Sequence, residues 1–558
     1  MKWRLTSSTT PQTLPEVIET LLHQREIKDT ATFFNPVSPL ELEAVSVGFD
    51  EAEISKACQR LVQARDKKER VLIFGDYDAD GICATGVMWL GLREFGIEAF
   101  PFIPHREKHG YGVSEAALED ILKAGKPDLI ITVDNGIVAH DPLELLAQSG
   151  IDVILTDHHT CELDSAGMPH FPKATAIVHT TQLCGTTVAW MLLKSLFEFA
   201  PLENVDVTGC LGELLDLCGI ATIADQVQLR GANRSFAYFG IRALRTSQRP
   251  GILALCQQAK IDQAQISTYH VNYGLGPRIN AMGRLEHGLD ALRLLCTKNP
   301  ATAQELAQTL SDVNIRRQEL TDDLLQLAIS QVAPQTDEKL LIVASNMYHE
   351  GIIGLIAGRL SELYHKPAIA IAVGPDTAKG SARSVQGVHI TDLMRIIKDD
   401  LTSVGGHPLA GGFGLESSKL ATVVERLHAV AQRDIDSALL EPSITIDATL
   451  PAGLVSLALA EALQQWEPLG QGNRQPLFAL RNMRVTQAFA MGKDNRHLKL
   501  VVENPESGVL IDTIGWGQGK IAAHLTPGQI LSLAGHVEIN DYKGRRTVQM
   551  IVKDVEVG

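Results

Sequence analysis

Residues 71–90 read VLIFGDYDADGICATGVMWL: an apolar run, three aspartates at every second position, and a second apolar run. The first run is short and rich in β-branched residues, which is typical of a buried strand, and the second is long enough for a helix. Asp76, Asp78 and Asp80 therefore stand where the strand ends. Ligands bind beyond the carboxyl ends of strands in open parallel sheets, so this stretch predicts both a fold class and the position of a site.

The same pattern occurs twice more in the first half of the chain. DLIITV at residues 128–133 runs into Asp134, and DVILT at residues 152–156 runs into the triplet Asp157–His159. Helical segments separate these apolar runs, as in a chain that alternates strands and helices. We therefore expect an α/β fold with a buried parallel sheet.

The chain of 558 residues is too long for one core, because single cores stop growing near about 250–300 residues. Leucines at helical spacing between residues 289 and 332 predict one or two long helices that connect two units. A second α/β unit follows, with predicted strands at 339–345 and 368–373 around a helix at 353–364.

The chain after Pro442 has short strand-like runs separated by Gly, Asn and Pro, among them ITIDATL and HLKLVVE, which predict a small β-barrel. The expected organisation is a series of five parts: an N-terminal segment (1–45), a first α/β domain that carries the site (46–245), a helical connector (246–335), a second α/β domain (336–440) and the barrel (441–558).

Composition narrows the class of protein. The net charge of −16 argues against a protein that coats nucleic acid over its whole surface, although one basic groove remains compatible with it. No segment has the roughly 18 uninterrupted apolar residues of a membrane helix, and the first residues lack the apolar run of a secretory signal, so a cytoplasmic location is expected. The eight scattered cysteines contain no C-x-x-C pair and are expected to be reduced core residues.

Three interpretations fit the aspartates of GDYDADG: a solvated surface, a calcium loop or a catalytic metal site. A calcium loop that starts at Asp76 needs a glutamate at its twelfth position, which is Val87. The apolar runs on both sides disfavour a solvated surface. A catalytic metal site is the remaining interpretation.

The carboxyl ends of parallel strands meet at one edge of a sheet, so Asp134, Asp157 and His158 are expected beside this triplet. Asp225 ends the apolar segment 214–226. Considered alone, it is interpreted as a residue at the end of a helix. Considered together with the other acids, it is interpreted as a metal ligand. Mixed Asp and His ligands suit Mn²⁺ better than Mg²⁺, though both are compatible. Two such ions about 3.5–4 Å apart support hydrolysis of a phosphoester.

These motifs carry a resemblance. GDYDADG, VDNG, TDHH and ATIAD resemble the four motifs of the DHH superfamily of phosphoesterases, in their usual order. The resemblance implies two bound ions, with Asp134 as the bridge between them, and the metal ligands Asp78, Asp80, Asp134, His158 and Asp225. It implies that Asp76 and Asp157 lie at or beside the ions and that His159 serves the phosphate or proton transfer.

Further segments are similar to one family within this superfamily, the RecJ exonucleases: NYGLGPRINAMGRL at 272–285, YHEGIIGLIAGRL at 348–360 and WEPLGQGNRQP at 466–476. That similarity implies a DHHA1-type second domain, an OB-fold barrel and digestion of single-stranded DNA from 5′ to 3′ in repair and recombination. Possible partners are a single-strand-binding protein and a helicase. Three features depart from the family: residues 410–412 read Ala-Gly-Gly in place of Ala-Ala-Gly, Arg474 replaces a proline, and the segment 176–190 is short and lacks an Asn-Pro.

The resemblance also implies a set of substrate contacts. Ser381, Arg383 and His407 are expected at the 5′-phosphate, and Arg106, Arg278 and Asn280 along the path of the strand. A surface ion pair is the alternative for each arginine. In the barrel, residues 481–550 contain nine basic and six acidic side chains, a difference of 9 − 6 = +3, and Trp516 and Tyr542 are candidates for base stacking.

Two other functions compete with this prediction. One is a DHH phosphodiesterase of short oligonucleotides or cyclic dinucleotides, which the presence of a barrel disfavours. The other is an inactive scaffold that binds single strands, which the complete set of acidic motif positions disfavours.

Overall fold

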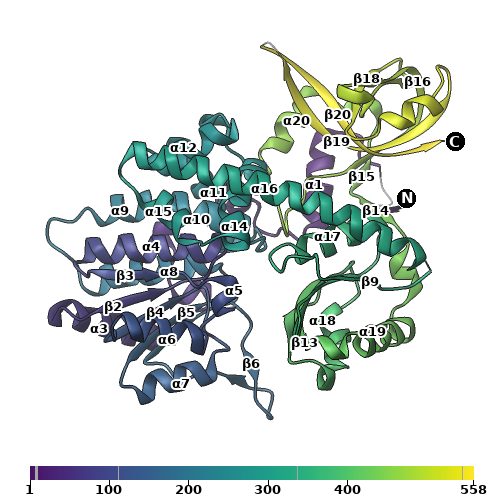
Figure 1. Ribbon diagram of the computed structural model, residues 1–558. Helices are drawn as coiled ribbons and strands as arrows, with labels where there is room; N and C mark the ends of the chain where they lie inside the picture. The colour runs from purple at the N-terminus through teal and green to yellow at the C-terminus, as the bar shows by residue number, and fades with distance from the viewer. Residues whose placement is uncertain (7–9, 111, 336, 543, 558) are drawn as a thin grey trace. The chain divides into compact units, whose positions relative to one another are not determined.

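The computed structural model describes residues 1–6, 10–110, 112–335, 337–542 and 544–557, without the side chain of Tyr542. Its ribbon is drawn in Figure 1. The chain forms two compact units. One unit consists of Ser38–Val227 and Phe239–Glu441; the other, here called the barrel unit, consists of Met1–Val37, Gln228–Tyr238 and Pro442–Gly558.

The first unit contains the predicted parallel sheet, in the order β3-β2-β4-β5-β8. All its pairings are parallel. The order changes direction between β2 and β4, which is where open sheets bind ligands. The strands are β2 (Val71–Phe74), β3 (Ala99–Phe102), β4 (Leu129–Val133), β5 (Asp152–Asp157) and β8 (Ala176–His179). Every residue of β2 and β4 is buried, which confirms the sheet that the apolar runs predict.

Helices cover both faces of this sheet (Figure 1). Leucines and isoleucines of α6 and α7 pack with β2, β4 and β5 in one apolar cluster. On the other face α4 contacts α8 and α10, and α3 contacts β8. The helices are α3 (Glu51–Lys67), α4 (Ala79–Phe95), α5 (Arg106–His109), α6 (Glu115–Ala124), α7 (His140–Gln148), α8 (Gly185–Phe199), α9 (Val207–Glu213) and α10 (Leu215–Ala224).

The segment Val207–Ala224 is the one stretch of the described chain that is long and apolar enough to cross a membrane. In the structure it forms the two helices α9 and α10, and α10 contacts α4 and α8. All its residues from Leu215 to Ile223 are buried. Its apolar character is therefore explained by the core of this unit.

The helical connector ends in the long helix that the leucine spacing predicts. Helix α16 (Pro300–Val332) has 33 residues, and Asn299 caps its first turn. It packs against α12 and α14. The preceding helices are α11 (Gly231–Thr246), α12 (Pro250–Ala259), α13 (Thr268–His270), α14 (Gly276–Leu285) and α15 (Leu289–Cys296).

The second sheet has the order β12-β13-β11-β10-β9, and only β9 and β10 run parallel. Helix α17 packs against β10 and β11, and helices α18 and α19 also cover this domain. The strands are β9 (Leu341–Ser345), β10 (Ala368–Val373), β11 (Thr377–Arg383), β12 (Ser403–His407) and β13 (Ala410–Glu416). The helices are α17 (Ile353–Tyr364), α18 (Ile390–Arg395) and α19 (Leu420–Asp434).

The barrel unit contains a closed five-stranded barrel, because β16 pairs with both β17 and β19. This confirms the predicted barrel. Its strands are β16 (Phe478–Met491), β17 (His497–Glu503), β18 (Leu510–Gly515), β19 (Ile530–Tyr542) and β20 (Arg545–Val557). Trp516 is 55% exposed, so its ring is available at the surface. The side chain of Tyr542, the other stacking candidate, lies outside the described side chains.

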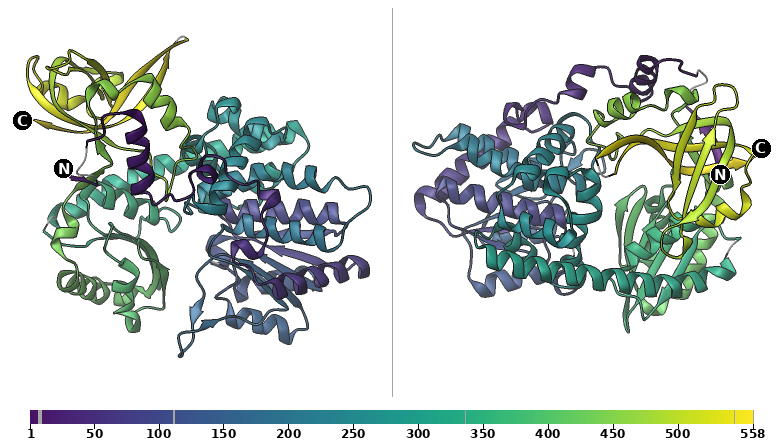
Figure 2. Two further views of the ribbon diagram at one scale, coloured as in Figure 1. Left: turned by 180° about the vertical axis from the view of Figure 1, so that it is seen from behind. Right: turned by 90° about the horizontal axis from the view of Figure 1, so that it is seen from above.

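The N-terminal segment folds onto this barrel. Strand β1 (Lys2–Leu5) pairs in parallel with β14 (Ser443–Ile446), and helix α1 (Leu14–Gln24) buries Val17 and Leu21 in the barrel core. The left view of Figure 2 shows α1, in dark purple, beside the barrel. The run ITIDATL is not one strand, since β14 ends before Asp447 and a separate strand, β15 (Ala448–Thr449), pairs with β16.

Candidate metal centre

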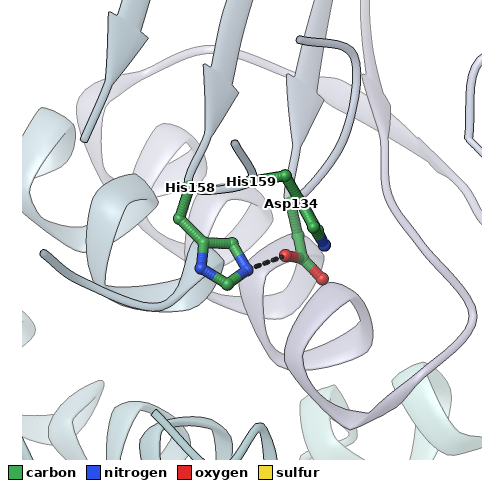
Figure 3. A group of neighbouring side chains, drawn as sticks. All are labelled: Asp134, His158 and His159. Atoms are coloured by element: carbon green, nitrogen blue, oxygen red, sulfur yellow. Dashed lines mark ion pairs between the residues drawn. The ribbon is translucent and has the colours of Figure 1, made fainter. Parts of the chain in front are cut away.

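The predicted acids and histidines do lie together at the edge of the parallel sheet. Figure 3 shows His158, which follows β5, directed at Asp134, which follows β4. The Nε2 atom of His158 is 3.1 Å from Oδ1 of Asp134, 3.7 Å from Oδ2 of Asp225 and 3.8 Å from Oδ2 of Asp80. Four residues from separate motifs therefore converge on one point.

Their ligand atoms form three overlapping groups, and within each group the atoms lie within 4.8 Å of one another. Asp134 and His158 each belong to two of these groups. The groups are Asp76, Asp78 and Asp134; Asp80, His158 and Asp225; and Asp134, His158 and His159.

The start of helix α4 positions the first acids. Oδ1 of Asp78 accepts hydrogen bonds from the backbone N–H groups of Asp80 (2.9 Å) and Gly81 (3.0 Å), which caps the helix. This cap explains why the helix begins at Ala79 and not at Ile82, where the apolar run begins. A Cβ at Gly81 would lie 2.5 Å from Cβ of Asp76, so the close approach requires glycine.

Helix α8 holds Asp80, a contact that sequence reasoning missed. Its first backbone N–H groups, from Gly185 and Thr186, donate to the two carboxylate oxygens of Asp80 at 2.7 and 2.8 Å. The Thr186 hydroxyl donates to the Asp80 carbonyl at 2.8 Å. A helix N-terminus offers unpaired N–H groups and a positive dipole end to a carboxylate. The residue pattern Gly-Thr-Thr at the start of an apolar run was the available signal.

The electrostatics fit a divalent cation. Asp76, Asp80 and Asp134 are at most 2% exposed. Burial, with the charge of Asp78, raises the pKa of Asp76 to about 8. Burial and the charge of Asp80 raise the pKa of Asp134 well above its usual value. Buried carboxylates at such short range are destabilising unless a cation gathers them.

Several buried ligand atoms lack a hydrogen-bond partner among the described residues. They include Oδ1 of Asp76, Oδ1 of Asp134 and Nε2 of His158. Burial lowers the pKa of His158, which favours the neutral imidazole that a metal requires. Orphaned buried polar atoms are rare in folded proteins, and a bound ion supplies the missing partner. The residues therefore fit Mn²⁺ or Mg²⁺.

Asp157 has a different position from the other acids. Its Oδ1 accepts hydrogen bonds from the N–H groups of His158 (2.7 Å) and His159 (3.1 Å) and from Nδ1 of His159 (2.8 Å). Its Oδ2 accepts the N–H of Ile137 at 2.9 Å. Although burial opposes it, the bond to His159 lowers the pKa of Asp157 to about 2. The same bond overcomes burial and raises the pKa of His159 to about 9. Asp157 therefore orients the ring of His159.

A set of arginines lies beside the acids. Burial, together with the nearby charges of Arg106, Arg317 and Arg383, lowers the pKa of Arg284 to about 10, although the charge of Asp78 opposes this. Nη1 of Arg284 donates to the carbonyl of Gly351 at 3.1 Å, and Arg106 lies over the ring of Tyr77 at 5.1 Å. Arg284 was not among the predicted site residues, although it lies inside the quoted segment 272–285.

Two residues that are predicted to contact the DNA strand, Arg278 and Asn280, form hydrogen bonds within the protein. Oδ1 of Asn280 accepts the N–H of Ala79 at 2.8 Å, which fixes α14 against the start of α4. Arg278 donates from Nε to the Ser311 hydroxyl (3.0 Å) and from Nη1 to the carbonyl of Gly274 (2.7 Å). Any contact of these two side chains with substrate stays a prediction.

The three predicted phosphate contacts lie in the second sheet. Nη1 of Arg383 donates to the carbonyl of Ala382 at 2.8 Å and lies 3.4 Å from the Ser381 hydroxyl. A Cβ at Gly354, in the first turn of α17, would lie 3.1 Å from that hydroxyl and 3.2 Å from Nη2 of Arg383. His407 ends β12 and is exposed. The structure thus joins Ser381 and Arg383 at one helix start.

One further group of metal-binding residue types occurs in this unit, at the hairpin of β6 (Glu162–Leu163) and β7 (Pro169–His170). The rings of His140 and His170 stack with centroids 4.2 Å apart and planes 11° from parallel. Nε2 of His140 lies 3.6 Å from Oε2 of Glu162. Glu162 and His170 are exposed, and exposed acidic groups are common without an ion.

The sheet, the acids and histidines at its edge and the second α/β domain together define a phosphoesterase of the DHH class. The model of the DHH family N-terminal domain matches residues 70–222, and the DHHA1 domain model matches residues 337–433. The RecJ OB domain model matches residues 446–554.

The chain belongs to the RecJ family. It is 32% identical to the single-stranded-DNA-specific exonuclease RecJ of Salmonella typhimurium, over 90% of each chain. It is 31% identical to the corresponding exonuclease of Bacillus subtilis, over 91% of this chain and 64% of the relative's length. The crystal structure of RecJ from Thermus thermophilus in complex with Mn²⁺ matches with a TM-score of 0.81 and 27% identity, over 100% of this chain and 80% of that one.

Proposed function

We propose that this protein is a metal-dependent exonuclease that hydrolyses the phosphodiester bonds of single-stranded DNA. The observation that carries the proposal is the position of Arg106 and Arg284 beside the buried acids at the sheet edge, with Arg383 near these two arginines. Arginine binds phosphate through paired N–H groups, so a phosphodiester is held where the ions are expected. The activity of the related exonucleases supports the same substrate.

Two divalent ions bound in this centre would supply Lewis-acid stabilisation and lower the pKa of an attacking water. The residues that would hold them are Asp76, Asp78, Asp80, Asp134, His158 and Asp225. Asp80 is fixed by α8, and Asp134 stands between the groups of ligand atoms.

His159 provides the remaining function at the phosphate. Because its Nδ1 is bonded to Asp157, a protonated ring has its second N–H at Nε2, away from that carboxylate. A protonated imidazole there neutralises a phosphate oxygen or gives a proton to the departing oxygen. The arginines keep the neighbouring backbone phosphates in place.

Digestion is proposed to run from 5′ to 3′ in repair and recombination, with Ser381, Arg383 and His407 at the 5′-terminal phosphate. The donor groups of Ser381 and Arg383 at the start of α17 support this assignment. A helicase that separates strands and a single-strand-binding protein are the proposed partners, because the substrate must first be unpaired.

The test compares cleavage with binding. Asp134→Ala is expected to abolish Mn²⁺-dependent digestion of a labelled single strand, while binding of that strand in EDTA stays measurable. The matched control is Asp141→Ala, an exposed aspartate on α7, and it is expected to keep wild-type digestion. Full digestion by Asp134→Ala, or faster hydrolysis of a dinucleotide than of a long strand by the wild-type protein, would refute the proposal.

A further inference from the structure

The barrel unit contains a cavity of about 1190 Å³. The residues that line it are all different from those of the metal centre. Its walls come from three distant parts of the chain: residues 22–28 of the N-terminal segment, Arg230, and the loop 470–474 with Asp447. The volume exceeds the roughly 300–1,000 Å³ of small-ligand pockets, so it accommodates more than one small group.

The cavity has more positive than negative side chains. Four cationic side chains line it, Arg25, Lys28, Arg230 and Arg474, against the carboxylates of Glu26 and Asp447, a difference of 4 − 2 = +2. Asp447 is 2% exposed and is already bonded to Nη2 of Arg474 (3.1 Å) and to the N–H of Leu477 (2.8 Å).

Two of these cations lack a counter-charge. Among the described residues, no carboxylate lies within 4.0 Å of the charged groups of Lys28 or Arg230, and both residues are exposed. By contrast, four of the barrel's basic side chains form ion pairs: Arg481 with Glu556, Arg484 with Glu503, Lys499 with Asp512, and Arg546 with Glu461. Positive charge without an ion pair is therefore present at the cavity, as it also is among the described residues of the barrel at Lys493, Arg496, Lys520 and Arg545.

Arg25 forms the buried part of this site. Its side chain is 7% exposed, and its Nε has no hydrogen-bond partner among the described residues. One Nη donates to the carbonyl of Arg474 at 2.9 Å, while the nearest oxygen of Asp447 is 3.9 Å away. Burial lowers the pKa of Arg25; the charge of Asp447 opposes this effect, and the charges of Arg474 and Arg230 add to it. Like charges held this closely are stabilised by an anion.

We propose that this cavity binds phosphate groups, with Arg25, Lys28, Arg230 and Arg474 as their ligands. Guanidinium groups bind phosphate through paired N–H donors, and an ammonium adds a point charge. The choice of a single strand's backbone as the source rests on the proposed function; a free nucleotide has the same chemistry. Arg474, where relatives are expected to have proline, belongs to this site.

The test measures binding in EDTA, where no strand is cut, so it is independent of nuclease activity. Fluorescence anisotropy with a labelled single-stranded 20-mer is compared for the wild-type protein, the double variant Lys28→Gln/Arg230→Gln, and Arg474→Gln. The double variant removes no ion pair, so its fold is expected to be kept. The control is Arg433→Gln, an exposed residue of the other unit that pairs with its neighbour Asp434.

The double variant is expected to bind the strand about tenfold more weakly, and its plot of log affinity against log salt should be shallower by about 1.4, or 0.7 for each lost phosphate contact. Arg433→Gln should match the wild-type protein. If instead pyrophosphate or a deoxynucleoside monophosphate binds, and this binding is lost in the double variant while strand binding is unchanged, the cavity is a phosphate site for a free nucleotide.

Two results would overturn the inference. One is unchanged affinity and salt dependence for all these phosphate probes in both variants. The other is binding of an oligoglutamate peptide that the double variant loses, with no phosphate probe affected. If the wild-type protein does not cleave the strand in Mn²⁺ while the binding results in EDTA are as expected, the proposed function fails and the cavity assignment stands.

Discussion

Asp134 combines two unfavourable features that a bound ion explains. Its φ of 63° lies in the left-handed region, which is uncommon for a residue other than glycine, and its carboxylate is buried beside other acids. Backbone strain of this kind persists where the surrounding structure determines it, as at functional sites. Figure 3 shows the result, a carboxylate directed at His158.

The raised pKa of Asp76 makes the stability of the metal-free protein depend on pH. A carboxyl group with a pKa of about 8 in the folded state and about 4 in the unfolded state binds more protons when folded. Its contribution to the free energy of unfolding therefore falls as the pH rises from about 4 to about 8.

In EDTA, Asp76→Asn is expected to be more stable than the wild-type protein at pH 8, with a smaller difference at pH 5. Denaturant unfolding at both pH values measures this difference. Asp141→Asn, which changes an exposed aspartate, is the control and should show no such trend. A difference that stays the same or shrinks as the pH rises from 5 to 8 would contradict the raised pKa of Asp76.

At the scale of elements, the start of α8 decides the geometry of the acids. A Cβ at Gly185 would lie 2.4 Å from Oδ1 of Asp134, and the N–H of the same residue holds Asp80. One glycine therefore positions two predicted ligands. Residues that orient metal ligands typically change metal affinity by about 10–100-fold when they are substituted.

Gly185→Ala is accordingly expected to weaken Mn²⁺ binding at least about tenfold, as measured by calorimetric titration of metal-free protein. The helical content of the variant should stay unchanged. Gly212→Ala is the matched control, because a Cβ at this glycine of α9 meets no atom within 4 Å. If the Gly185→Ala variant binds Mn²⁺ as tightly as the wild-type protein, the close approach of Gly185 to Asp134 does not determine the geometry of the metal ligands.

The sequence predicts some elements better than others for physical reasons. Strands β2, β4 and β5 are buried on both faces, so their apolar runs are visible without any partner. Strands β11 and β13 contain several glycines and small residues, and only their pairing identifies them. The hydrogen bonds from α8 to Asp80 connect residues that are separated by 105 and 106 positions in the sequence. A local sequence pattern cannot reveal a contact over that separation.

At the scale of the whole molecule, the net negative charge of the protein is compatible with a negatively charged DNA substrate because the basic side chains are concentrated in particular places. The chain has a net charge of −16, yet arginines gather beside the metal centre and four cations line the cavity of the barrel unit. Sequence composition gives only the sum. Of the nine basic residues counted in the barrel, Arg481, Arg484, Lys499 and Arg546 form ion pairs in the described structure, so part of the +3 excess is neutralised.

The domain types were predictable because each has its own periodicity, and the fold confirms them. The attachment of the N-terminal segment to the barrel was not predictable, since β1 pairs with β14 across more than 400 residues. The metal centre was predictable as a set because parallel strands end at one edge. The orienting position of Asp157 depends on hydrogen bonds that only the structure contains.

Diffraction from crystals soaked in Mn²⁺, recorded at the manganese absorption edge, tests the central claim most directly. Two anomalous peaks are expected at the edge of the parallel sheet, one on each side of the Asp134 carboxylate, with His158 and Asp225 within bonding distance. Absence of any peak among these residues, or a peak only elsewhere in the molecule, would contradict the account.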